Sequence, residues 1–105
     1  MSNVEIKWQN EGERLQVKIS GTLDFLNSRD IKGKIMEKLE TDTALLRVDL
    51  AEIEHIDSTG IALLATLRRT MSNRSGNLEV CNAPFNVTQI FRLIGLETFF
   101  ETRHC

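Results

Sequence analysis

Features that mark several specialised classes of protein are scarce in this sequence. Its 105 residues include one proline and two cysteines, with no internal repeat, low-complexity segment or linker. No apolar stretch approaches the roughly 20 residues that span a membrane. The polar start Met1-Ser2-Asn3 lacks the charged and apolar regions of a signal peptide. By default we expect a cytoplasmic protein with no membrane-inserted segment.

The two cysteines indicate neither a disulfide framework nor a metal site. Cys81 lies in an apolar-alternating stretch, where a small buried residue is expected, and Cys105 is the last residue. No metal ligand set is therefore expected from them.

The sequence also has no large excess of positive or of negative charge. Thirteen basic and fifteen acidic residues leave a net charge of -2, and no basic run could track a phosphate backbone. Nucleic acid is not an expected partner. There is no Walker-type loop or Gly-x-Gly-x-x-Gly run, so no cofactor is expected and nucleotide binding is not indicated. The length suits one core, and we expect a single domain over 1–105.

Apolar periodicity predicts an α/β protein with strands and helices in alternation. The expected order is strands over 4–8 and 15–19, a helix over 27–40, a strand over 44–50, a helix from 58, a strand over 78–81, a helix after Pro84 and a tail that adds an edge strand or a short helix. The first two strands form an antiparallel pair. Strands that alternate with helices imply right-handed crossovers and a largely parallel second half of the sheet.

The most informative segment is Asp57-Ser58-Thr59-Gly60, which lies between a buried strand and an apolar helix. Asp57 is a favoured N-cap residue, and its carboxylate can accept a bond from a free helix N–H group. Ser58 then falls in the first turn, where the helix dipole favours an anion such as phosphate. Two interpretations stay open here: a helix cap only, or a site of phosphorylation.

Four segments, taken in order, resemble the STAS family, which is named for sulfate transporters and anti-sigma factor antagonists. They are Gly21-Thr22-Leu23-Asp24, Val48-Asp49-Leu50, Ile56-Asp57-Ser58-Thr59-Gly60-Ile61 and Arg92-Leu93-Ile94-Gly95-Leu96. Their order and spacing extend the resemblance over nearly the whole chain. It implies a STAS-type fold, a mixed sheet of about four to five strands with about three to four helices packed mainly on one face.

The resemblance also implies a function, that of an anti-sigma factor antagonist. In that branch of the family, the first hydroxyl of the Asp-Ser-[Ser/Thr]-Gly motif is phosphorylated by a partner kinase, which points to Ser58 before Thr59. The expected partner is a serine kinase or anti-sigma factor of the histidine-kinase-like ATPase superfamily, which would bind the unmodified chain. A serine phosphatase would reset the switch.

We expect the partner to dock around the start of the Ser58 helix and the loop after Asp24. That loop, Phe25-Leu26-Asn27-Ser28, departs from the small polar residues common in the family, so it leaves the partner's identity open. Asp24 is either a turn residue or a negative group that positions Ser58. The candidate docking residues are Asp24, Phe25, Asn27, Ser28, Asp57, Thr59, Gly60, Ile61, Ala62, Ala65 and Arg68. Ile61, Ala62 and Ala65 lie off the helix stripe assigned to the core.

Two other functions are considered. Ser58 as a catalytic nucleophile would need a base and an oxyanion site, and only half of the hydrolase pattern Gly-x-Ser-x-Gly is present, so no enzyme and no catalytic residue are expected. The alternative is a constitutive adaptor, like the small STAS subunits that brace the ATPase of a lipid transporter. An adaptor would use the same helix surface but would not need an acceptor hydroxyl at Ser58.

Overall fold

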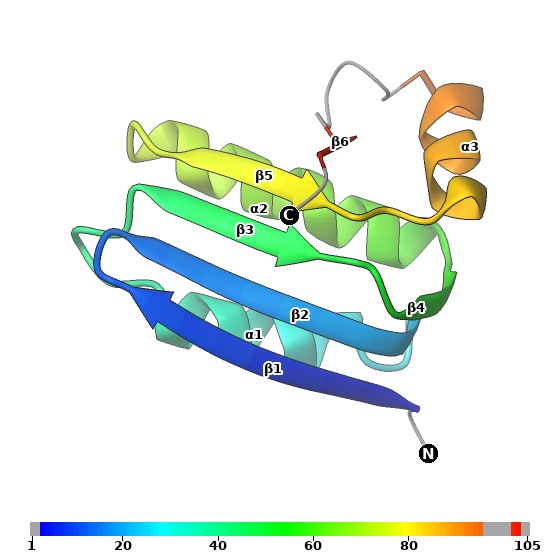
Figure 1. Ribbon diagram of the computed structural model, residues 1–105, viewed down its shortest axis with the longest axis horizontal. Helices are drawn as coiled ribbons and strands as arrows, with labels where there is room; N and C mark the ends of the chain where they lie inside the picture. The colour runs from blue at the N-terminus through cyan, green and yellow to red at the C-terminus, as the bar shows by residue number, and fades with distance from the viewer. Residues whose placement is uncertain (1–2, 96–101, 104–105) are drawn as a thin grey trace.

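The chain forms a mixed sheet with helices on one side in the computed structural model, which describes residues 3–95 and the backbone of 102–103. The elements in order are β1 (Val4–Glu11), β2 (Arg14–Leu23), α1 (Ser28–Lys38), β3 (Leu45–Asp49), β4 (Ile53–Ile56), α2 (Ser58–Asn73), β5 (Asn77–Cys81), α3 (Phe85–Leu93) and β6 (Thr102–Arg103) (Figure 1). The predicted alternation of strands and helices is confirmed. Two short strands, β4 and β6, were not assigned residue by residue, although an edge strand in the tail was among the expectations.

The strands follow the order β1-β2-β3-β5-β6, and β4 pairs with the end of β2. β1 and β2 form the predicted antiparallel pair, and all other pairings are parallel. The carboxyl ends of β2, β3, β4 and β5 therefore point the same way. The connections that follow β2 and β4 meet at that edge of the sheet (Figure 1).

Alternation along the strands separates an apolar face from a polar one. The inward residues of β2 and β3, such as Val17 and Val48, are fully buried. α1 and α2 lie side by side against this face (Figure 1) and bury Ile31, Ile35, Leu64 and Leu67. Because each strand alternates with period two, the opposite face of the sheet carries the polar residues. The predicted α/β class, a mixed sheet with helices packed mainly on one face, is confirmed.

Cys81 departs from the sequence-based expectation. It is fully buried at the end of β5, as predicted, but it is disulfide-bonded, so the expectation that the cysteines form no disulfide is wrong for this residue. The other cysteine of the chain, Cys105, lies outside the described residues.

Candidate functional site

Asp57 joins the start of α2 to the loop that follows β2. As the N-cap of α2 it has extended backbone angles, and its Oδ1 accepts hydrogen bonds from the backbone N–H groups of Thr59 (2.9 Å) and Gly60 (3.0 Å). The Thr59 hydroxyl donates to the same oxygen at 2.5 Å. Oδ2 accepts from the backbone N–H of Phe25 at 3.1 Å. The predicted N-cap is therefore confirmed, and the same carboxylate also holds the neighbouring loop.

These bonds determine the charge of Asp57. Burial raises the pKa of its carboxyl, but the hydrogen bonds from the Thr59 hydroxyl and from the N–H groups of Gly60, Phe25 and Thr59 outweigh it. The net effect lowers the pKa of Asp57 below its ordinary value. A fixed negative charge therefore stands at the N-terminus of α2 at neutral pH.

Ser58 is the first residue of α2, and its side chain is exposed. Among the described residues its hydroxyl has no hydrogen-bond partner. The hydroxyl of Thr59, by contrast, is engaged with Asp57. The first turn of α2 contains no acidic residue, and the N-cap carboxylate of Asp57 directly precedes it. Of the two hydroxyls in the motif, Ser58 presents the one that is free to react.

The loop after β2 is held by its own polar side chains. The backbone N–H of Asp24 donates to Asn27 Oδ1 at 3.0 Å, the N–H of Leu26 donates to Asp24 Oδ1 at 3.0 Å, and Asn27 Nδ2 donates to the carbonyl of Thr22 at 2.7 Å. Asp24 therefore acts as a turn residue, and an effect of its charge on Ser58 stays a prediction. The held loop leaves Phe25 69% and Leu26 66% exposed.

Three of the predicted docking residues lie inside the protein. Asn27 is only 4% exposed, because its side chain closes the loop, and Ile61 is also only 4% exposed. Gly60 is buried where α2 meets the sheet: an added Cβ would lie 2.6 Å from Ile56 Cγ1 and 2.8 Å from the Leu23 carbonyl oxygen. The first turn of α2 rests on the ends of β2 and β4, which buries residues beyond the stripe predicted from helical spacing. Asn27, Gly60 and Ile61 are therefore not part of the exposed docking surface, which corrects the prediction for these three residues.

The other predicted docking residues keep some exposure. Phe25, Thr59 and Ala62 are exposed, and the partly buried members are Asp24, Ser28, Asp57, Ala65 and Arg68. The structure brings the loop residues and the start of α2 together through the bond between Asp57 and the Phe25 N–H. Ala65 and Arg68 lie further along α2.

A groove between α1 and α2 is lined by two positively charged side chains that were not among the predicted site residues. We call it the α1–α2 groove; its volume is about 320 Å³, and it is lined by Ser28, Arg29, Lys32, Thr59, Ala62, Leu63 and Thr66. Arg29 and Lys32 are three positions apart, which places them on one side of α1. That spacing, directly after the docking loop, was the available signal in the sequence.

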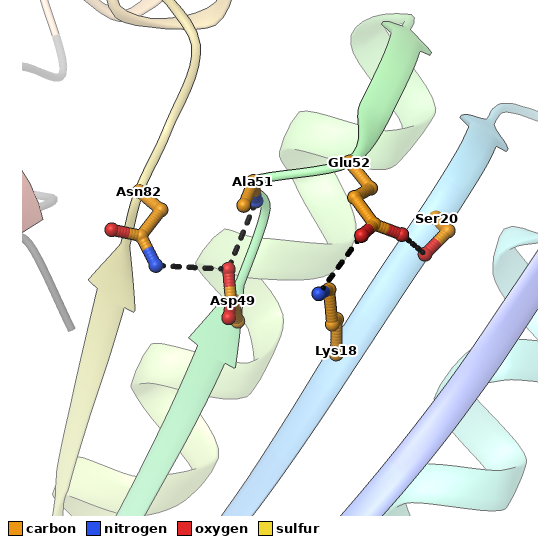
Figure 2. Close-up of polar contacts among 6 residues, drawn as sticks. All are labelled: Lys18, Ser20, Asp49, Ala51, Glu52 and Asn82. Carbon is orange, nitrogen blue, oxygen red and sulfur yellow. Dashed lines mark hydrogen bonds and ion pairs between the residues drawn. The ribbon is translucent and has the colours of Figure 1, made fainter.

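A second polar cluster holds the connection between β3 and β4 in place (Figure 2). β4 ends at Ile56, directly before Asp57. Asp49 is 7% exposed and accepts hydrogen bonds from the Ala51 N–H (2.9 Å) and from Asn82 Nδ2 (3.2 Å). Next to it, Glu52 pairs with Lys18 Nζ at 3.1 Å and accepts from the Ser20 hydroxyl at 3.1 Å. The hydrogen bonds from Lys18 and Ser20 lower the pKa of Glu52. These contacts support the loop, and no group of residues suited to hold a metal ion occurs in the described part of the chain.

Comparisons with known proteins agree with this architecture. A family model described as "Mlab, STAS domain" matches residues 6–101. The anti-sigma-B factor antagonist of Bacillus subtilis is 27% identical over 99 residues, which cover 94% of this chain and 88% of that protein. No helix in the described residues has both the length and the apolar character needed to cross a membrane.

Solved structures share the fold. The crystal structure of an anti-sigma factor antagonist from Mycobacterium paratuberculosis superimposes with a TM-score of 0.83 at 19% identity, covering 96% of this chain and 86% of that one. The Bacillus cell fate determinant SpoIIAA in its phosphorylated form superimposes with a TM-score of 0.75 at 17% identity, covering 93% of this chain and 90% of that one.

Proposed function

This chain belongs to the STAS domain family, and from that premise we propose that it is an anti-sigma factor antagonist-like regulator controlled by phosphorylation at Ser58. Unmodified, it binds a serine kinase or anti-sigma factor of the histidine-kinase-like ATPase superfamily. Phosphorylated, it is released, and a serine phosphatase restores it. The chain acts as a single cytoplasmic domain over 1–105 and has no catalytic activity of its own.

The observation that carries the proposal is the free, exposed hydroxyl of Ser58 at the N-terminus of α2. A kinase can reach it without unfolding the helix. The unpaired N–H groups and the dipole of the first turn favour an added anion. The engaged hydroxyl of Thr59 makes that residue the weaker acceptor.

The proposed docking surface surrounds Ser58. It comprises the exposed side chains of Phe25 and Leu26 in the loop, together with Thr59 and Ala62 on α2. Large apolar side chains at an exposed loop are typical of a protein-binding surface. Asp24 and Asp57 shape this surface by holding the loop in place, and Ser28, Ala65 and Arg68 extend it along the two helices.

The release mechanism follows from charge. Phosphorylation adds about -1.5 to -2 charges beside Asp57. In the free protein water and the helix N-terminus stabilise that charge, so the fold is retained. At a closed interface the phosphate loses water and faces the partner's surface, which can cost several kcal/mol. A penalty of about 3 to 4 kcal/mol weakens binding by a few hundredfold or more.

The test is to incubate the purified chain with each serine kinase of that superfamily from its own organism and to measure its intact mass. We expect one added phosphate on the wild type and none on Ser58→Ala. By titration calorimetry, Ser58→Ala binds that kinase, whereas the phosphorylated protein and Ser58→Asp do not, and all melt within a few degrees of one another. In the same titration Phe25→Glu binds weakly with an unchanged melt. Tight binding by the phosphorylated protein would refute the mechanism.

A second candidate is a constitutive adaptor subunit of a transporter ATPase. The matching family model is described as "Mlab, STAS domain", a description that does not single out antagonists within the family. An adaptor would bind its ATPase through the same helix surface with no modification of Ser58. Intact mass of the chain isolated from its own cells discriminates the two: a phosphorylated fraction at Ser58 supports the regulator.

A further inference from the structure

Two positively charged side chains line the α1–α2 groove next to the proposed phosphorylation motif. Arg29 and Lys32 line it from α1, and Thr59, the neighbour of Ser58, lines it from α2. Neither cation forms an ion pair with any described residue, whereas Lys34 pairs with Asp30 at 3.1 Å on the same helix. No acidic side chain lines the groove. This positive site stands on a protein whose net charge is -2.

The surroundings of the groove indicate the class of ligand. It is continuous with the loop that exposes Phe25 and Leu26, since Ser28, which follows that loop, lines it. Arg29, Lys32 and Thr59 are all exposed, so the groove lies open to solvent. Small-molecule sites bury most of their ligand. Cations beside exposed apolar side chains instead match a protein interface, with apolar anchors and charged groups that steer association.

We propose that the α1–α2 groove receives an acidic segment of the partner kinase, which Arg29 and Lys32 attract while Phe25 and Leu26 supply the apolar anchor. This rests on the proposed function and names the chemistry of the partner at the same surface. It also specifies which groups of the partner a phosphate on Ser58 acts against. The added negative charge falls beside the groove, where it repels the partner's carboxylates and competes for the same two cations.

The experiment measures the affinity and association rate of the kinase that phosphorylates the wild type. The test variant is the double charge reversal Arg29→Glu with Lys32→Glu. The matched control is Lys7→Glu with Lys34→Glu, which changes the net charge equally at exposed positions outside the groove. We expect the test variant to bind about tenfold or more weaker, mainly through slower association, and the control to bind within about twofold of wild type.

Salt and stability complete the test. Raising the salt concentration should weaken binding of the wild type more than that of Arg29→Ala with Lys32→Ala, because fewer charged contacts remain to be screened. Thermal melts of all variants should remain cooperative, since both residues are exposed. Equal affinity of the test variant and the control would overturn the proposal while leaving phosphorylation by the kinase intact. Failure of the wild type to bind any kinase would instead count against the proposed function.

Inorganic phosphate tests the competing class of ligand. Titrated into the free protein, it should produce no heat that depends on Arg29 and Lys32. Saturable binding at millimolar phosphate or below, lost in the test variant, would identify a small-anion site and overturn the assignment to an acidic protein segment.

Discussion

At the scale of single residues, the site depends on one carboxylate. Asp57 caps α2 and holds the Phe25 N–H, so it positions both parts of the proposed docking surface. Asp57→Ala removes the cap and the bridge together. We expect it to lower the free energy of unfolding by about 1–2 kcal/mol at pH 7, measured by urea denaturation. Asp42→Ala, at an exposed carboxylate without a partner among the described residues, should change it by less than about 0.5 kcal/mol.

The same pair of variants tests the pH dependence. The pKa of Asp57 is lowered in the folded protein, so its ionised form contributes stability above the unfolded-state pKa of about 4. That contribution is lost as the pH falls through the folded-state pKa. The difference between wild type and Asp57→Ala should therefore shrink toward pH 3. A difference that stays constant from pH 7 to pH 3 would contradict this assignment.

The positions of site residues were predictable where they depend only on residues close by in the sequence. Asp57 as N-cap and Ser58 in the first turn follow from a few neighbouring residues and were confirmed as positions. Asn27 and Ile61 were misassigned because their burial depends on contacts that sequence spacing does not contain. The Asn27 amide reaches back to the Thr22 carbonyl, and Ile61 is covered only once α2 rests on the sheet.

At the scale of elements, two helical glycines give opposite expectations. An added Cβ at Gly60 would collide with the Leu23 carbonyl oxygen at 2.8 Å, whereas at Gly33 in α1 nothing lies within 4 Å. Gly60→Ala should therefore destabilise the protein by about 1–3 kcal/mol through overpacking. Gly33→Ala should stabilise it by about 0.5–1 kcal/mol through helix propensity. Urea denaturation of both variants measures this; unchanged stability of Gly60→Ala would show that the junction of α2 and the sheet can relax.

Helices and strands were predictable where the apolar periodicity within the element itself identifies it. Alternation identified β1 and β2, and helical spacing identified α1 and α2. β4 was not assigned, because its four residues pair with β2 only across a shift of register at Gly21 and Thr22. Such a pairing depends on where the preceding loop places the strand.

At the scale of the whole molecule, stability should be unequal. β2 and β3 lie within the sheet and bury Val17, Ile19, Leu46 and Val48 completely. α3 buries Val87 and Phe91 but leaves Phe85 76% and Leu93 84% exposed. Amide hydrogen exchange in low urea should therefore release α3 before β2 and β3. Simultaneous exchange of all three at every urea concentration would contradict the expectation and indicate a single cooperative unit.

The hydrogen bonds to Asp57 also bear on the chemistry of Ser58. Oδ1 accepts three hydrogen bonds and Oδ2 accepts the bond from Phe25, and a carboxylate held in this way is a weak proton acceptor. It gives the neighbouring hydroxyl little help in losing its proton. A kinase that modifies Ser58 must then bring its own general base. The pH profile of the phosphorylation rate should follow the titration of that base in the kinase, so the timing of the switch is set by the enzyme rather than by its substrate.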